Sequence, residues 1–150
     1  MRYFDTMGTC IYCTMIEQDQ VFKERVISET EHFIVIAPFF SRSPFETWIL
    51  PKRHRASFAE IPPLERKDLA AVLIDILSRL CQGLGDPDYN YMVHSAPYQE
   101  DPADYYHWHV QILPKLSEVA GFELGSGIYL NSTRPEENAR YLRETTIHAS

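Results

Sequence analysis

The sequence predicts a single α+β domain over residues 1–150, in which an antiparallel sheet carries one long helix and a C-terminal helix. Two observations favour this class. A chain of 150 residues with 45% hydrophobic residues is long enough to bury one sizeable core. Several short strand-like segments surround one long amphipathic segment, residues 63–82. One long helix among many strands indicates α+β rather than the parallel sheet of an alternating α/β chain.

The strands are predicted where apolar and polar residues alternate between turn signals. Residues 26–37 alternate around a polar corner and are expected to form two strands of a meander. Further strands are predicted at residues 46–50, 89–94 and 107–113. Residues 122–130 are expected to form a late strand or one arm of a hairpin.

The helices are predicted from apolar residues at helical spacing. This spacing runs from Pro63 to Leu80, and Gly83 and Gly85 are expected to end the long helix near residue 82. A terminal helix is predicted over residues 135–143, because a proline at the first turn is typical of a helix start.

The composition excludes several classes of function. The net charge of −7 and the pI near 5.3 argue against nucleic-acid binding, which needs a concentrated basic surface. No apolar segment is long enough to span a membrane, and the first residues lack the layout of a secretory signal, so we expect the cytoplasm. The local group Lys52, Arg53 and Arg55 suits a small phosphorylated ligand, with solvation at the surface as the alternative.

A close pair of cysteines, Cys10 and Cys13, has the spacing of a metal or redox motif. A tight turn would aim both thiolates at one point, and a structural zinc then needs two more ligands. The candidates are His54 and one histidine of the pair at 107 and 109. A redox pair or inert thiols are the alternatives. Three other residues are expected to carry no chemistry: His32, Cys81 and His148.

Residues 107–113 read His-Trp-His-Val-Gln-Ile-Leu and are the most informative segment. A period of two puts His107, His109 and Gln111 on one face of a strand and the apolar residues on the other. Buried strands seldom align imidazoles, because polar groups removed from water need partners. A satisfied structural histidine pair is the alternative, but the rest of the chain favours a functional site.

These motifs together resemble the histidine triad (HIT) superfamily. The shared features are CxxC near the start, the segment WILPKRH ending at His54, one long helix, and HxHx(H/Q) on the last core strand. More narrowly, the chain resembles the C-terminal half of galactose-1-phosphate uridylyltransferases. The matching segments are SRSPFETWILPKRH (41–54), YNYMVHSAP (89–97), HWHVQILP (107–114) and AGFELGSGIYLN (120–131). This resemblance implies a HIT-like sheet, and the catalytic N-terminal half of that family is expected to be absent.

The resemblance implies a nucleotidyltransferase. His109 would attack the α-phosphorus of a nucleotide sugar, with a UDP-sugar favoured, and form a nucleotidyl-histidine. Gln111 would donate an amide hydrogen bond to a phosphate oxygen. Lys52 and Arg53 would neutralise phosphate charge. Phe45 would line the base pocket, with core packing as the alternative.

We expect zinc as the cofactor, held by Cys10, Cys13, His54 and His107. We also expect a homodimer, because members of the resembled family pair two such domains. No nucleic-acid or membrane partner is expected.

Two other functions remain open. In the first, His94, His107 and His109 hold a metal, and the chain is a non-catalytic nucleotide-binding module. In the second, the chain hydrolyses nucleoside phosphoramidates or dinucleoside polyphosphates. The second is disfavoured, because Gln111 stands where such hydrolases have a third histidine.

Overall fold

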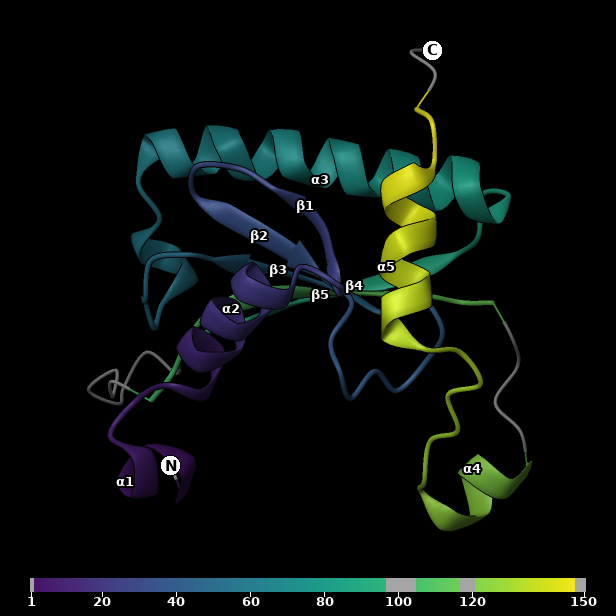
Figure 1. The fold of residues 1–150 in the computed structure, drawn as a ribbon, viewed down its shortest axis with the longest axis horizontal. Helices are drawn as coiled ribbons and strands as arrows, with labels where there is room; N and C mark the ends of the chain where they lie inside the picture. The colour runs from purple at the N-terminus through teal and green to yellow at the C-terminus, as the bar shows by residue number, and fades with distance from the viewer. Residues whose placement is uncertain (1, 97–104, 117–120, 148–150) are drawn as a thin grey trace.

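A computed structural model describes residues 2–96, 105–116 and 121–147, and in it helices and strands occur in separate groups along the chain. In chain order the elements are α1 (Arg2–Met7), α2 (Ile11–Phe22), β1 (Val26–Glu29), β2 (Phe33–Ile36), β3 (Thr47–Pro51), a short 3-10 helix (Phe58–Glu60), α3 (Pro63–Leu84), β4 (Tyr89–His94), β5 (His109–Pro114), α4 (Gly121–Ser126) and α5 (Pro135–Glu144). Figure 1 shows α3 along one side of the sheet and α2 on the other. This is the predicted α+β arrangement.

The five strands form one antiparallel sheet in the order β1-β2-β3-β5-β4. The histidine strand β5 therefore lies between β3 and β4. Its register sets Gln111 opposite Trp48 and His109 opposite His94. Directly opposed residues on neighbouring strands have their side chains close together, so these two pairs are neighbours on the sheet.

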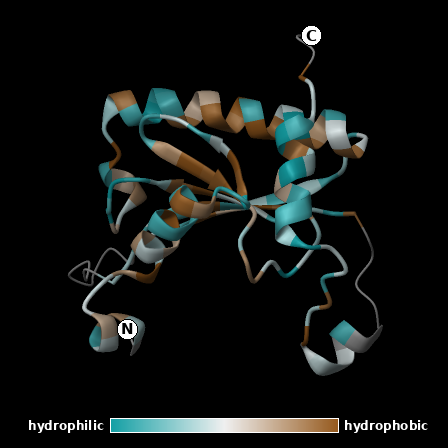
Figure 2. Ribbon diagram, in the orientation of Figure 1, coloured by the Kyte–Doolittle hydropathy of each residue, from teal (hydrophilic) through white to brown (hydrophobic). Residues whose placement is uncertain are grey.

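Alternation along the strands separates two apolar clusters, one on each face of the sheet. The cluster on the α3 side joins the sheet to α3 and α5 and includes Phe33, Val35, Ile49, Trp108, Val110, Ile112, Leu69, Ile76, Leu80 and Leu142. The cluster on the α2 side is smaller and consists of Ile16, Val26, Ile34, Ile36, Trp48 and Leu50. Figure 2 shows the resulting hydrophobic colour on the strands. The apolar side of β5 thus faces α3, and His109 and Gln111 lie on the α2 side.

Most predicted elements are confirmed. The meander of residues 26–37 forms β1 and β2, and the long helix extends to Leu84, where Gly85 adopts a left-handed conformation (φ 76°). The histidine strand begins at His109, two residues later than predicted. The preceding Trp108 donates its backbone N–H to the carbonyl of Arg55 instead of joining the sheet (2.9 Å).

The prediction of a strand at residues 122–130 is wrong. The short helix α4 occupies its first part, and residues 127–130 have no regular structure. The apolar residues at the end of this segment are consecutive and stay exposed, with exposed fractions of 58% for Ile128, 57% for Tyr129 and 61% for Leu130. A short apolar run forms a strand only where a neighbouring strand and a core are available.

The helices α1 and α2 were not expected from the sequence. Helix α2 buries only Ile16 and Asp19, and its last residues, Val21 and Phe22, are 75% and 70% exposed. A helix whose apolar face is limited to its first turns gives little periodic signal. Tyr12, Met15 and Ile16 pack on the α2-side cluster. Polar contacts also attach the helix, including an ion pair between the buried Asp19 and Arg25 (2.6 Å).

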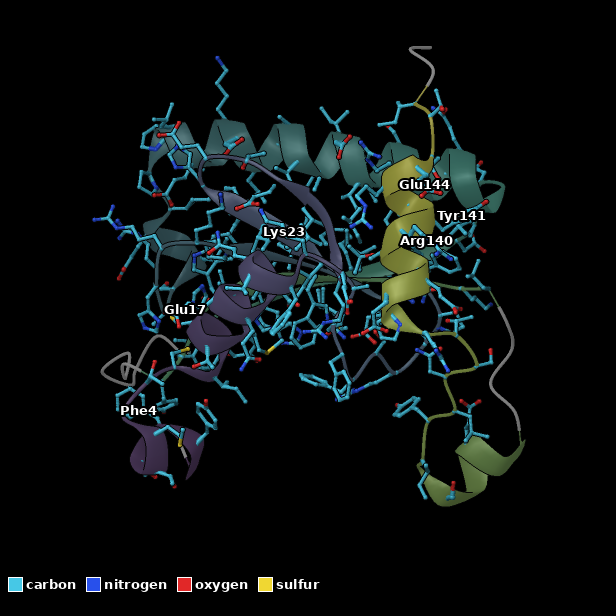
Figure 3. All side chains as sticks on the ribbon, in the orientation of Figure 1. Phe4, Glu17, Lys23, Arg140, Tyr141 and Glu144 are labelled. Atoms are coloured by element: carbon cyan, nitrogen blue, oxygen red, sulfur yellow. The ribbon has the colours of Figure 1, made fainter. Side chains whose placement is uncertain are left out.

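Helix α5 is largely hydrophilic and docks through few residues. Ala139 and Leu142 join the α3-side cluster. Tyr141, labelled in Figure 3, donates its hydroxyl to the carbonyl of Gly83 (2.5 Å) and packs its ring against Phe45 (centroids 5.6 Å apart). These contacts fix α5 against the end of α3. Among the described residues, no helix is long and apolar enough to cross a membrane.

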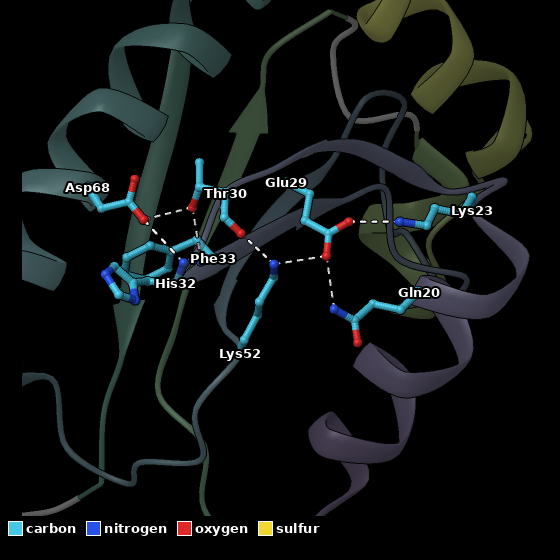
Figure 4. A network of polar contacts seen from close by, with 8 residues as sticks. All are labelled: Gln20, Lys23, Glu29, Thr30, His32, Phe33, Lys52 and Asp68. Carbon is cyan, nitrogen blue, oxygen red and sulfur yellow. Dashed lines mark hydrogen bonds and ion pairs between the residues drawn. The ribbon is translucent and has the colours of Figure 1, made fainter.

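The end of α2 is joined to the sheet by a polar network centred on Glu29 (Figure 4). Its carboxylate accepts hydrogen bonds from Gln20 and Lys23, each at 2.9 Å, and pairs with Lys52 at 2.9 Å. Lys52 also donates to the carbonyl of Thr30. These hydrogen bonds, from Lys52 first and then Lys23 and Gln20, lower the pKa of Glu29 from 4.5 to about 2.

Glu29→Gln is expected to destabilise the fold by on the order of 1 kcal/mol near neutral pH, as for partly exposed ion pairs. The folded state lowers the pKa of Glu29. The contribution of Glu29 to the stability of the fold is therefore complete above about pH 4.5 and is lost as the pH falls through about 2. Urea unfolding at decreasing pH should therefore show the free energies of unfolding of the wild type and of Glu29→Gln becoming equal. The exposed Glu24→Gln is the matched control, and a difference that does not change with pH would contradict this account.

Candidate active site and metal centre

Four potential metal ligands converge between the start of α2 and the sheet. The ligand atoms of Cys10, Cys13, His54 and His107 all lie within 4.8 Å of one another. Cys13 Sγ is 3.3 Å from Nδ1 of His54 and 3.6 Å from Nδ1 of His107. Zinc ligands at tetrahedral angles, about 2.3 Å from the ion for sulfur and about 2.0–2.1 Å for nitrogen, lie about 3.5 Å apart. The predicted ligand set is therefore together, at a spacing that fits zinc.

Local structure directs each ligand toward this point. Cys10 immediately precedes α2 and Cys13 lies in its first turn, so the pair opens a helix instead of forming the expected tight turn. His54 follows β3 and His107 precedes β5. His107 Nε2 lies 2.8 Å from the carbonyl of Pro51. Because a carbonyl only accepts, Nε2 carries the proton, and the Nδ1 lone pair is left for a metal.

The electrostatics of the cluster also suit a cation. Burial, followed by the neighbouring Cys10, raises the pKa of the Cys13 thiol to about 12. Burial lowers the pKa of His107 to about 4, so the imidazole is neutral. A cation would allow both thiolates to form and would release their protons. A CxxC pair that opens a helix also occurs in redox proteins, but the two imidazoles beside these thiols favour a metal.

His109 lies beside this cluster, within a stack of aromatic rings. Its side chain is 4% exposed. The ring centroid is 4.6 Å from that of His94, 4.7 Å from Tyr12 and 4.9 Å from Trp48. Nδ1 lies 3.1 Å from the carbonyl of His107, so Nδ1 carries the proton and Nε2 keeps its lone pair. Burial lowers the pKa of His109 to about 4, which keeps the ring neutral near pH 7.

Gln111, the third residue of the row, belongs to a buried chain of hydrogen bonds. Its amide nitrogen donates to Glu46 (2.6 Å), and its amide oxygen lies 2.8 Å from Nε2 of His94. Glu46 is 1% exposed and was not singled out from the sequence. The available signal was a charged residue next to the apolar run that forms β3, since buried charges need partners.

The other predicted ligand-binding residues have different surroundings. Lys52 is engaged by Glu29 and the carbonyl of Thr30, as described above. Arg53 is exposed. Phe45 packs against the α3-side cluster, on the opposite face of the sheet from His109. Core packing, the alternative for Phe45, therefore fits its position better than a base pocket beside His109.

The alternative metal site of His94, His107 and His109 has less support. Both ring nitrogens of His107 are already directed elsewhere, Nε2 to Pro51 and Nδ1 to Cys13. Nε2 of His94 is bonded to Gln111. Within residues 2–96, 105–116 and 121–147, the cluster around Cys13 is the one group with converging metal ligands.

The fold and the site define a domain of the histidine triad type, with an HxHxQ motif that leads into strand β5 and a Cys2His2 cluster beside it. Residues 1–149 match the family described as Galactose-1-phosphate uridyl transferase, C-terminal domain. The chain belongs to this family.

Two curated relatives match nearly the whole chain. ADP-glucose phosphorylase of Arabidopsis thaliana is 40% identical over 147 residues, which cover 97% of this chain and 40% of the relative. Galactose-1-phosphate uridylyltransferase of Thermotoga maritima is 34% identical over 155 residues, which cover 97% of this chain and 48% of the relative. The chain thus spans less than half the length of either relative.

Solved structures agree with this assignment. The crystal structure of the Arabidopsis thaliana ADP-glucose phosphorylase with bound ADP-glucose is 38% identical, with a TM-score of 0.86, over 97% of this chain and 46% of that chain. A Zn-bound histidine triad family protein from Mycobacterium smegmatis is 22% identical, with a TM-score of 0.63, over 92% of this chain and 93% of that chain. The second likeness confirms the HIT-like fold.

Proposed function

We propose that this chain transfers a nucleoside monophosphate from a nucleotide sugar to a phosphate-bearing acceptor through a covalent bond to His109. The observation that carries the proposal is the state of this imidazole. The His107 carbonyl holds the proton on Nδ1, and the ring is neutral. A neutral imidazole with a free Nε2 lone pair is the form that attacks phosphorus.

The transfer has two balanced steps. First, Nε2 of His109 forms a bond to the α-phosphorus, and the bond to the bridging oxygen breaks, so a sugar phosphate leaves with that oxygen. Second, a phosphate oxygen of the acceptor forms a bond to the same phosphorus, and the P–N electron pair returns to Nε2. The amide group of Gln111 has a second N–H beyond the one given to Glu46, and this can bind a non-bridging oxygen. An amide cannot act as an acid, so an ionised phosphate acceptor is favoured over water.

The relatives support a nucleotide sugar as the substrate class. One is an ADP-glucose phosphorylase, whose solved structure contains ADP-glucose, and another is a galactose-1-phosphate uridylyltransferase. The higher identity to the phosphorylase makes ADP-glucose as strong a candidate as the UDP-sugar that the sequence alone favoured. We therefore propose both as donors to be tested.

We further propose that zinc is the resident cofactor. An ion on Cys10, Cys13, His54 and His107 would have four protein ligands and no open position for a substrate, which is typical of a structural site. It would hold the start of α2 against the sheet. Tyr12, between the two cysteines, would then be kept over the ring of His109.

A non-catalytic nucleotide-binding module is the second candidate function. The observation in its favour is the 4% exposure of His109 beneath Tyr12 and Trp48. If these rings stay in place, a phosphate cannot reach Nε2, and a nucleotide would bind beside the stack without a covalent bond.

We also propose that two copies pair through β4. This strand is at the edge of the sheet, and its residues Tyr89, Tyr91, Met92 and Val93 are 40% to 65% exposed. A free edge with exposed apolar side chains is a template for strand pairing. Light scattering should give twice the chain mass, and Tyr91→Glu should shift it toward the monomer. A concentration-independent monomer for the unmodified chain would contradict the pairing.

The function is tested by incubating the purified protein with UDP-glucose or ADP-glucose carrying a radiolabel at the α-phosphorus. A nucleotidyl-histidine should appear as a protein-bound label that is labile in acid and stable in base. An acceptor sugar phosphate or inorganic phosphate should discharge it. Nucleotide binding by calorimetry without any label from either donor would overturn the catalytic proposal and support the binding module.

A further inference from the structure

Glu46 is a buried acid on which three hydrogen-bond donors converge. It immediately precedes β3 and is 1% exposed. One oxygen accepts from the backbone N–H of Arg42 (2.6 Å), and the other from the indole N–H of Trp48 (2.8 Å) and the amide of Gln111 (2.6 Å). Backbone and indole N–H groups only donate. A carboxylate therefore satisfies all three, whereas an amide of the same shape would turn its own N–H groups toward a donor.

The contact with Glu46 fixes the direction of the Gln111 amide. Because the carboxylate accepts, the amide nitrogen of Gln111 must face it, and the amide oxygen faces the opposite way. That oxygen lies 2.8 Å from Nε2 of His94. An amide oxygen only accepts, so His94 donates and its proton lies on Nε2. The lone pair of His94 is then on Nδ1.

This chain of hydrogen bonds ends on the ring that stacks against His109. His94 and His109 are directly opposed on β4 and β5, with ring centroids 4.6 Å apart and planes at 16°. Hydrogen bonds in series polarise one another where the local dielectric is low. The negative charge of Glu46 therefore increases the electron density of the His94 ring. An electron-rich ring of this kind stabilises positive charge that develops on His109 when its Nε2 binds phosphorus.

We propose that Glu46 is a positioning residue that sets, through Gln111, the tautomer and polarity of His94 on the face of His109. The tautomer follows from the hydrogen bonds alone. The effect on His109 rests on the proposed function.

The tautomer is tested by long-range proton–nitrogen NMR of the imidazoles, which distinguishes protonated from unprotonated ring nitrogens. In the wild type, His94 Nε2 should be of the protonated type and Nδ1 of the unprotonated type. The informative variant is Glu46→Gln with Trp48→Phe, because losing the indole donor lets the new amide nitrogen face Gln111. Gln111 should then reverse and turn its own N–H group to His94, moving the His94 proton to Nδ1.

The matched control is Trp48→Phe alone, which keeps the carboxylate and should leave both His94 nitrogens as in the wild type. A wild-type His94 protonated on Nδ1, or a double variant with unchanged His94 signals, would overturn the proposal. If the double variant does not fold, Gln111→Leu serves instead. It removes the acceptor for His94 and should give a mixture of tautomers, while a single Nε2-protonated form would count against the relay.

The catalytic consequence has a separate readout. The double variant should form the nucleotidyl label about 10- to 100-fold more slowly than Trp48→Phe, the range found when a hydrogen-bond partner that orients a metal-binding histidine is removed. Equal rates would remove the proposed effect on His109 while leaving the tautomer result valid. A wild type that takes no label would reject the nucleotidyltransferase proposal, and the NMR spectra would still decide the role of Glu46.

Discussion

Cys13→Ser is expected to reduce zinc content from about one ion per chain to almost none. Cys13 Sγ lies 3.3 Å and 3.6 Å from the two imidazoles of the cluster, and a serine hydroxyl is a poor replacement for a thiolate. The folded state should lose several kcal/mol. This is less than the about 10–16 kcal/mol of structural zinc in zinc-finger peptides, because the α3-side core forms without the ion.

The measurements are metal analysis of protein purified without chelator and urea unfolding of the same samples. Cys81→Ser is the matched control, because Cys81 is exposed at the end of α3, outside the cluster, and hydrogen-bonded to Asp86 (3.3 Å). Chelator treatment of the wild type should lower its stability to that of Cys13→Ser. Unchanged zinc content and stability in Cys13→Ser would reject the assignment.

The sequence predicts those helices and strands in which buried residues recur with the period of a helix or a strand within one segment. Helix α3 has an apolar stripe, and β5 alternates between polar residues (His109 and Gln111) and core residues (Val110 and Ile112), so each signal lies within one segment. The grouping of Cys10, Cys13, His54 and His107 was also predictable. Thiolates and imidazoles have few roles in common other than binding a metal, and the four residues are together as expected.

The parts that the sequence does not predict depend on contacts between distant segments. Helix α2 has only a short apolar face, on Tyr12, Met15 and Ile16, and its end is fixed by polar contacts such as Gln20 with Glu29. Glu46 gains its role only because β3 and β5 are paired, which brings Gln111 within 2.6 Å. The prediction of Lys52 as a phosphate ligand rests on residue type, and the sequence gives no sign of its ion pair with Glu29 at the end of β1. Residue type indicates what chemistry is available, and the register of the sheet decides where it is used.

His109→Ala is expected to abolish the nucleotidyl label, because alanine has no nitrogen lone pair to replace that of His109 Nε2. The side chain is 4% exposed, so the substitution should also cost about 1–3 kcal/mol of stability. Labelling is therefore compared at a temperature where unfolding curves show the variant to be folded. His32→Ala, which removes an imidazole outside the site, should label like the wild type. A labelled His109→Ala protein would show that another residue is the nucleophile.

His109→Gly separates the chemistry of the imidazole from its place in the fold. Glycine leaves a space beside His94 and Trp48 that a free imidazole molecule fits. With added imidazole, the variant should again release sugar phosphate from the nucleotide sugar, but the nucleotide should leave as a nucleotidyl-imidazole and the protein should stay unlabelled. The matched control is His109→Ala, whose methyl group takes up part of that space and should weaken the rescue. Release of sugar phosphate without a protein label is expected only if the nitrogen at this position forms the bond to phosphorus. If the imidazole were purely structural, adding it would restore both the release and the protein label, or neither of them.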